Sequence, residues 1–196
     1  MRVEITQETD PDDSTLEVPW SDPSDPGHCY IDLKGNPSAA DSLEECKRYS
    51  ALGGLLRQAN AVHSPFVTAK CDVWATEELT EEERDFHLPH KVGSYVDLLI
   101  DGPELNASLE TNLRLAQSIA VHLGSVRLSA ELEICARRCL FHREERWGYY
   151  LTVFTHAYGA TPQTAEQEWN LATDALTKAL GEAARLFRPK VHAERA

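Results

Sequence analysis

The chain has 196 residues, enough for one domain of ordinary size that buries about 70% of its unfolded surface. Hydrophobic residues make up 42% and charged residues 26%, which is typical of a soluble globular protein and excludes disorder throughout. No apolar run approaches the ~20 residues of a membrane span. The first ten residues also lack the basic start and apolar stretch of a signal peptide.

The net charge limits the possible binding partners, and the cysteine content indicates the cellular compartment. Nineteen Lys and Arg stand against 32 Asp and Glu, for a net charge of −13. A field of that sign repels phosphate backbones and anionic lipids, and no basic stripe offsets it, so we expect no nucleic-acid partner and no membrane partner. The five cysteines are odd in number and lack a disulfide-framework spacing, which favours free thiols in the cytoplasm.

The first 27 residues differ from the rest of the chain. They are acidic and rich in proline and serine, and the X-Pro pairs and Asp/Ser turns disfavour a long regular element. We therefore expect residues 1–27 to form a loosely attached arm, in which residues 2–6 alternate and could form a short edge strand. Three apolar side chains could attach the arm to the body: Leu16, Val18 and Trp20. A single domain is expected over residues 28–190, followed by a tail over 191–196.

The body has a regular order of predicted elements. Alternating and apolar segments predict strands, and stripes at spacings of three and four residues predict helices. The expected strands cover residues 30–34, 66–75, 92–101, 129–141 and 148–158. The expected helices cover about 42–60 and 107–123, and a third begins after Thr161 with Pro162 at its first position and runs to about 187.

This order reads β-α-(ββα)-(ββα) and predicts a fold class. Short links between successive strands favour antiparallel pairing, because a parallel crossover needs a dozen or more residues. We therefore expect an α+β fold with a single antiparallel sheet and three helices on one face, of the ferredoxin-like type. The two ββα units also show faint similarity, with Tyr95–Leu98 matching Tyr150–Val153, and whether they are a true duplication stays open.

Strand alternation divides the sheet residues between two faces. Apolar residues are expected under the helices: Val67, Cys71, Val96, Leu98, Ile100, Leu132, Ile134, Leu151 and Val153. The opposite face, which we call the open face, mixes aromatic rings with carboxylates. Nine of its residues are candidates for ligand binding: Asp72, Trp74, Tyr95, Asp97, Glu131, Glu133, Tyr150, Phe154 and His156.

Three interpretations of the open face stay open. Its rings could pair across strands while its charges are merely solvated. Two copies of the chain could instead bury it as a face-to-face homodimer, because its aromatic content is high for a surface left in water. The face could also form a groove for a small cationic or amphipathic ligand, since rings provide apolar area and carboxylates provide charge.

Motifs for specific chemistry are absent from the sequence. There is no nucleophile elbow, phosphate loop, dinucleotide-binding glycine pattern or His-Glu-x-x-His, so no cofactor is expected. Cys135 and Cys139 would lie about 13 Å apart on one strand, too far to share a metal or a disulfide. His87 and His90 lie in a charged loop, which favours a solvated turn, and we expect no metal site.

Two functions remain. The favoured one is a non-catalytic α+β domain, dimeric, that binds a partner or a small ligand on its open face. The alternative is a small enzyme in which Glu131, Glu133 or Asp97 carries out general acid–base chemistry with His156. A carboxylate in an apolar floor has the raised pKa that such chemistry needs near neutral pH.

Overall fold

The structure is a computed structural model that describes residues 1–25, 27 and 29–187. Its strands are β1 (Arg2–Glu8), β2 (Thr15–Val18), β3 (Phe66–Thr76), β4 (His90–Ile100), β5 (Ala130–Phe141) and β6 (Arg146–Gly159). Its α-helices are α1 (Glu44–Arg48), α2 (Ser50–Ala59), α3 (Pro103–Asn106), α4 (Leu109–Leu123) and α5 (Pro162–Ala183). The tail expected over 191–196 lies outside the described residues, and in the described part no helix has the length and hydropathy needed to cross a membrane.

The strands form one mixed sheet, so the prediction of a single antiparallel, ferredoxin-like sheet was wrong. The order is β1-β5-β6-β4-β3, with β2 also paired to β5. Strands β3, β4, β6 and β5 pair antiparallel, whereas β1 and β2 run parallel to β5. Short links determine direction only between strands that are close in sequence, and β1 lies more than 120 residues before its partner.

The predicted order β-α-(ββα)-(ββα) was also wrong at its start. Residues 30–34 form no strand, and the sheet instead takes its extra strands from the first 18 residues of the chain. The helix expected over 42–60 is divided, with a 3-10 turn at Pro37–Ser42 before α1 and an extended Tyr49 between α1 and α2. Tyr49 is 3% exposed and packs edge-on against Trp169 of α5, at 5.4 Å between ring centroids. Burial of this ring accounts for the break.

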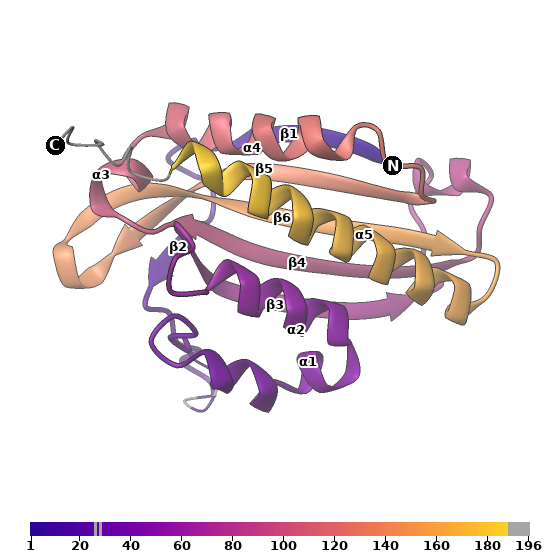
Figure 1. Cartoon of the computed structure of the whole chain (residues 1–196), viewed down its shortest axis with the longest axis horizontal. Coiled ribbons are helices and arrows are strands. Elements are labelled where there is room, and N and C mark those ends of the chain that lie inside the picture. Colours follow the sequence, from indigo (N-terminus) through magenta and orange to yellow (C-terminus); the bar gives the residue numbers. More distant parts are fainter. Residues whose placement is uncertain (26, 28, 188–196) are drawn as a thin grey trace, which may run out of the picture.

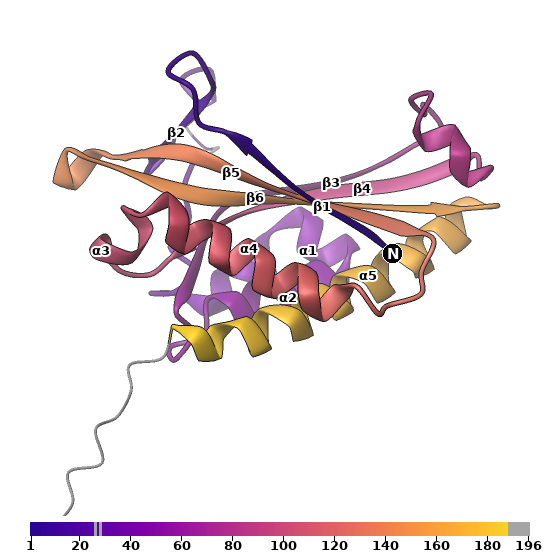
Figure 2. The same cartoon turned by 90° about the horizontal axis from the view of Figure 1, so that it is seen from above.

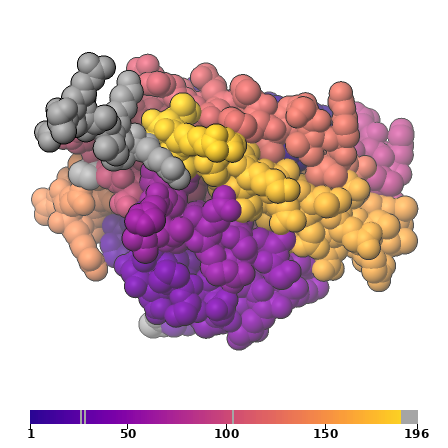
Figure 3. Space-filling view, in the orientation of Figure 1, coloured from indigo at the N-terminus to yellow at the C-terminus, as the bar shows by residue number. Residues whose placement is uncertain are grey.

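Helices α2, α4 and α5 cover one face of the sheet, as Figure 1 and Figure 2 show. Seen from this side in the space-filling view, α5 runs obliquely between α4 and α2, and the three helices hide most of the sheet (Figure 3). Helix α5 begins as its sequence predicts, because the Thr161 side chain accepts from the backbone N–H of Thr164 and Pro162 follows. The main core lies between this layer and the sheet, and includes Trp169, Leu132 and Ile134.

A β-bulge in β3 changes which residues face the helices. The register of β3 against β4 shifts between Thr68 and Cys71. Cys71 packs against the main core, but Val67 contacts a second apolar cluster on the open face, with Leu99 and Tyr150. The expectation that Val67 lies under the helices was therefore wrong, because one extra residue in a strand moves every preceding side chain to the other face.

The open face is bounded by two segments that rise from it on the side opposite the helices. One is the connection between β1 and β2, and the other is the connection between β3 and β4 (Figure 2). The segment after β2 also attaches to the face, since the indole N–H of Trp20 donates to the carbonyl of Ala69 at 2.8 Å. The open face is therefore flanked by three segments that lie on the side away from the helices.

Candidate functional site

A cavity of about 260 Å³ lies on the open face above β4, β5 and β6; we call it the Asp97 cavity. Its aromatic lining comes from Tyr95, Tyr150 and Phe154, and its charged lining comes from Lys70, Asp97 and Arg137. Ser14, Thr15 and Leu16 of the N-terminal segment line it as well. It holds the equivalent of about nine waters at ~30 Å³ each, which suits a ligand of roughly a dozen non-hydrogen atoms.

Asp97 is the most deeply buried charged group of this cavity, with 4% of its surface exposed. Its Oδ1 accepts a hydrogen bond from the hydroxyl of Thr152, the residue opposite it on β6, at 2.7 Å. Its Oδ2 accepts none from any residue that the structure describes. Burial raises the pKa of Asp97 to about 6, although the Thr152 hydroxyl and the charges of Lys70 and Arg137 oppose the rise.

Two cations of the same cavity also have unused hydrogen-bonding capacity. The Arg137 guanidinium pairs with Glu8 of β1 at 2.6 Å, but its buried Nε has no hydrogen-bond partner within the described residues. The Lys70 ammonium lies 4.6 Å from the centroid of the Trp20 ring. It forms no ion pair with a residue in the described part of the chain. The cavity therefore brings a carboxylate oxygen that accepts no hydrogen bond from the described residues together with two cationic side chains.

The aromatic side of the cavity is built from cross-strand pairs. Tyr95 of β4 is opposite Phe154 of β6, with 6.1 Å between their ring centroids. The Arg137 guanidinium lies 5.5 Å from the centroid of the Phe154 ring, on its face. Such ring pairs hold their position through packing, so the apolar wall is preformed.

A second cavity, of about 170 Å³, lies at the other end of the open face; we call it the acidic cavity. Glu131, Glu133 and His156 line it, together with Glu83 from the β3–β4 connection and Arg2 from β1. Beneath it, the hydroxyl of Tyr158 donates to Glu131 at 2.6 Å and approaches Glu83 at 3.3 Å.

The carboxylates of the acidic cavity are held in their charged form. Burial alone would raise the pKa of Glu131, but His156, which lies close to it, and hydrogen bonds from Tyr158 and Arg2 bring the pKa down to about 2. The pKa of Glu83 is likewise lowered, against its burial, by the Lys91 ammonium and the backbone N–H of Thr80. In the opposite direction, burial and the neighbouring Glu131 raise the pKa of Tyr158.

Glu83, Glu131 and His156 are the three residues of the described chain that could together hold a metal ion, with ligand atoms within 4.8 Å of one another. Both carboxylates already have cationic partners, however, since Lys91 pairs with Glu83 and Arg2 pairs with Glu131. A metal would have to displace or coexist with these two cations, so the donor set fits an ion poorly.

The nine candidate residues divide among separate places on the open face. Four of them line the Asp97 cavity: Tyr95, Asp97, Tyr150 and Phe154. Three line the acidic cavity: Glu131, Glu133 and His156. Asp72 lines a third cavity of about 420 Å³, which shares Lys70 and Tyr95 with the Asp97 cavity. The Trp74 ring lies over Gly93, and its centroid is 6.0 Å from the centroid of the His156 ring.

Because the candidate residues lie in separate cavities, only some of the carboxylates named from the sequence can act together with His156 in acid–base chemistry. Asp97 is opposite Thr152, four residues from His156 along β6, so their backbone positions are about 13 Å apart along the strands. Glu131 does meet His156, with 3.7 Å between a carboxylate oxygen and Nδ1. The low pKa of Glu131, however, keeps it ionised near neutral pH, which is the wrong state for a general acid.

Sequence reasoning left out several residues of these cavities. Alternation placed Lys70, Arg137 and Thr152 on the open face, and only their lack of a carboxylate or an exposed ring kept them from the candidates. Glu83 lies in a 3-10 turn of the β3–β4 connection, and residues 14–16 lie at the start of the short strand β2; in neither segment does a periodic pattern indicate which way a side chain points. Their place in the site depends on tertiary packing.

The fold and the two cavities define an α+β protein with a mixed sheet, one face covered by helices and the other lined by aromatic and charged residues. A scan against protein-family models finds no match, and searches of curated proteins and of solved structures find none either.

Proposed function

We propose that this protein is a non-catalytic binding protein whose open face takes up a small amphipathic molecule in the Asp97 cavity. The molecule would present a hydrogen-bond donor, charged or neutral, to Asp97 and an apolar part to Phe154 and Tyr95. Its size would be limited by a cavity volume of about 260 Å³, near the low end for small-molecule sites.

The observation that supports this proposal is the unpartnered oxygen of Asp97. A carboxylate that is 4% exposed and accepts one hydrogen bond is costly to bury. Oδ2 of Asp97 accepts no hydrogen bond from the described residues and lines the cavity, so it is a natural contact for a ligand donor. Aromatic walls next to it add apolar area and exclude water, which strengthens a charge-assisted hydrogen bond.

The acid–base alternative receives less support. It needs a carboxylate and His156 to act on one bond, and the carboxylate with the raised pKa is the one that lies far from His156. We propose further that the protein works in the cytoplasm, in keeping with the five free cysteines, of which Cys29 is exposed. Self-association through the open face also remains a proposal.

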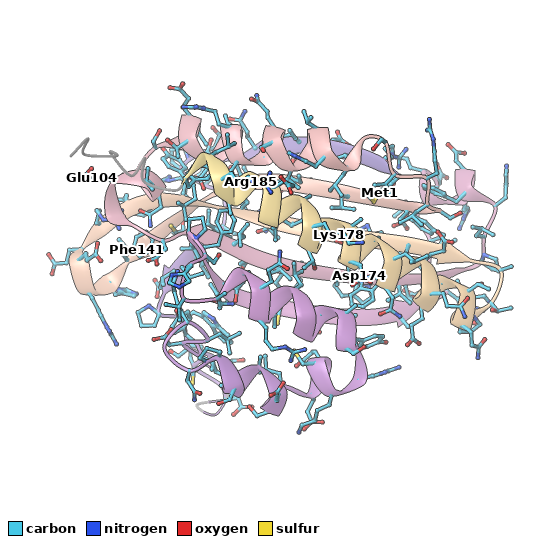
Figure 4. All side chains as sticks on the ribbon, in the orientation of Figure 1. Met1, Glu104, Phe141, Asp174, Lys178 and Arg185 are labelled. Carbon is cyan, nitrogen blue, oxygen red and sulfur yellow. The ribbon has the colours of Figure 1, made fainter. Side chains whose placement is uncertain are left out.

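A thermal-shift screen tests the binding function. The library would hold amines, carboxylates and amino acids of up to about a dozen non-hydrogen atoms, the size that the cavity permits. We expect some compounds to raise the melting temperature of the wild type but not of Asp97→Leu. The control is Asp174→Asn on α5, on the helix-covered side of the molecule (Figure 4), which should respond like the wild type.

Two outcomes would contradict the proposal. One is a screen in which no compound stabilises the wild type. The other is a set of compounds that stabilise Asp97→Leu as much as the wild type, because they would then bind elsewhere.

A further inference from the structure

The Asp97 cavity contains charged groups of both signs, and this restricts its ligand more narrowly than size does. The acceptor is Oδ2 of Asp97, which accepts no hydrogen bond from the described residues, and the cations are the Arg137 guanidinium and the Lys70 ammonium. All three residues line one cavity of about 260 Å³.

From this arrangement we infer that the ligand is a zwitterion, a small molecule with an ammonium group and a carboxylate close together and an apolar side chain. Its ammonium would bind Asp97, and its carboxylate would bind Arg137 and Lys70. The inference rests on the proposed function, because it concerns the same cavity and names the class of molecule bound there.

Ligands with a single charge satisfy this cavity less well. An amine would pair with Asp97 but would leave the two cations without a partner, next to its own positive charge. A carboxylate would pair with the cations but would approach the ionised Asp97 and leave its Oδ2 unsatisfied. A zwitterion satisfies both sides, and each charge-assisted hydrogen bond is stronger in a half-buried site than in water.

The contacts of Arg137 and Lys70 leave both side chains able to bind the carboxylate of the ligand. Glu8 pairs with one Nη of Arg137, so the guanidinium keeps charge and a further Nη for a second carboxylate. The guanidinium lies over the Phe154 ring, which holds its plane, and a planar guanidinium suits carboxylate recognition. Lys70 lies over the Trp20 ring and has a flexible stem with which to reach a carboxylate.

The apolar part of the ligand has its own place. Tyr95, Tyr150 and Phe154 line the same cavity, and Leu16 closes one side of it. Tyr150 is 4% exposed, and burial raises its pKa to about 12, so its hydroxyl stays protonated and uncharged. An aliphatic or aromatic side chain of moderate size would pack against these rings.

Isothermal titration calorimetry with matched probes tests the inference. The probes are leucine, methionine, phenylalanine and tyrosine, each compared with its decarboxylated amine and with its deaminated acid. We expect at least one amino acid to bind the wild-type protein at least tenfold more tightly than both of its singly charged analogues, since each lost ion contact is worth about that factor.

Variants then assign each charge. In Asp97→Asn, the amino acid should lose its advantage over the deaminated acid. In Arg137→Gln and in Lys70→Gln, it should lose part of its advantage over the amine. Lys178→Gln on α5, on the helix-covered side (Figure 4), is the matched control and should behave like the wild type.

The outcomes separate the two proposals. If an amine or an acid binds as tightly as its amino acid, the zwitterion inference is wrong and the cavity still binds a small amphipathic molecule. If none of the probes binds up to about 10 mM, beyond the weak end of specific affinity, the zwitterion inference is wrong as well. The thermal-shift screen then decides the proposed function independently. The wild-type comparison needs no variant, so a variant that fails to fold leaves the test intact.

Discussion

Asp97 and Glu131 lie on the same face of one sheet and have opposite electrostatic environments. Asp97 is surrounded by rings and has one hydrogen bond, so burial dominates and raises its pKa to about 6. Glu131 is also partly buried, but it accepts hydrogen bonds from Arg2 and Tyr158 and lies 3.7 Å from His156, and its pKa falls to about 2. The surroundings therefore disfavour the charged form of Asp97 and favour the charged form of Glu131.

The substitution Asp97→Asn is expected to stabilise the unliganded protein near neutral pH. The pKa of Asp97 is higher in the folded chain than the ordinary 3.8, so the folded state binds the proton more tightly. Stability therefore decreases as the pH rises from about 4 through 6, by up to about 3 kcal/mol. Removing the charge should raise the melting temperature by about 3–8 °C near pH 7.5.

Thermal unfolding followed by circular dichroism near pH 7.5 and pH 5 checks this prediction. The gain should shrink at the lower pH, where Asp97 is already largely protonated. If Asp97→Asn is instead less stable than the wild type near pH 7.5, the carboxylate contributes to folding and the ligand-binding interpretation loses its main support.

The substitution Glu131→Gln is expected to destabilise the protein. The pKa of Glu131 is lower in the folded chain than the ordinary 4.5, so its ionised form contributes stability that is fully present above about pH 4.5. That contribution disappears as the pH falls from 4.5 towards 2. We expect a loss of about 2–3 kcal/mol at neutral pH and of less than about 1 kcal/mol near pH 2.5.

Urea unfolding at a series of pH values measures this difference. Glu133→Gln is the matched control, because Glu133 is the next open-face residue of β5 and accepts one hydrogen bond from Thr6, at 2.7 Å, which glutamine can also accept. Its stability should change by less than about 0.5 kcal/mol. Equal losses of stability in both variants would show that the interactions of Glu131 contribute no more stability than the single hydrogen bond of Glu133.

At the scale of the elements, the N-terminal segment adds two strands to the sheet and lines the Asp97 cavity. Strands β1 and β2 pair in succession with β5, and β2 itself brings Leu16 to the Asp97 cavity. Glu8 pairs with Arg137, and Glu17 of β2 pairs with His142 at 2.8 Å. The position of this segment therefore affects the shape of the binding cavity.

The substitution Trp20→Phe is expected to loosen the segment around β2. It removes the indole N–H that donates to the carbonyl of Ala69 of β3 and should cost about 1 kcal/mol. Hydrogen exchange of the β2 amides should become faster, while exchange in α5 should be unchanged. Trp147→Phe is the control, since Trp147 is 52% exposed. Unchanged exchange in β2 of Trp20→Phe would contradict this attachment.

At the scale of the whole molecule, one face of the sheet is sealed by helices and the other remains partly open. Trp74, Tyr95 and Phe154 are half-buried on the open face, and each contacts another ring. A second copy of the chain could cover these rings, although the N-terminal segment already covers part of the face.

Light scattering is expected to give about twice the chain mass at high micromolar concentration, because the aromatic content of the open face favours burial against a second copy. Trp74→Arg should give the monomer mass by placing a charge among these rings. Leu171→Arg is the control, since Leu171 lies on α5 and is 51% exposed. A monomeric wild type at that concentration would remove the support for self-association.

The amino-acid sequence by itself determined the elements that depend on local patterns. Apolar stripes and a Thr-Pro start predicted α5, and alternation together with the short loop at 142–145 predicted the antiparallel pair β5–β6. Alternation in β4, β5 and β6 also placed Asp97, Glu131 and Phe154 on the face opposite the helices. These features are local, because the period of two residues in a strand or of 3.6 residues in a helix can be recognised within a short stretch of sequence.

Only the tertiary structure decided the features that join distant segments. The parallel pairing of β1 with β5 crosses more than 120 residues, the bulge in β3 moves Val67 to the open face, and the β3–β4 connection brings Glu83 beside Glu131. The contrast between Asp97 and Glu131 belongs here too. Both are carboxylates at alternating strand positions, and their pKa values differ because burial and hydrogen-bond partners come from the folded neighbours rather than from the adjacent sequence.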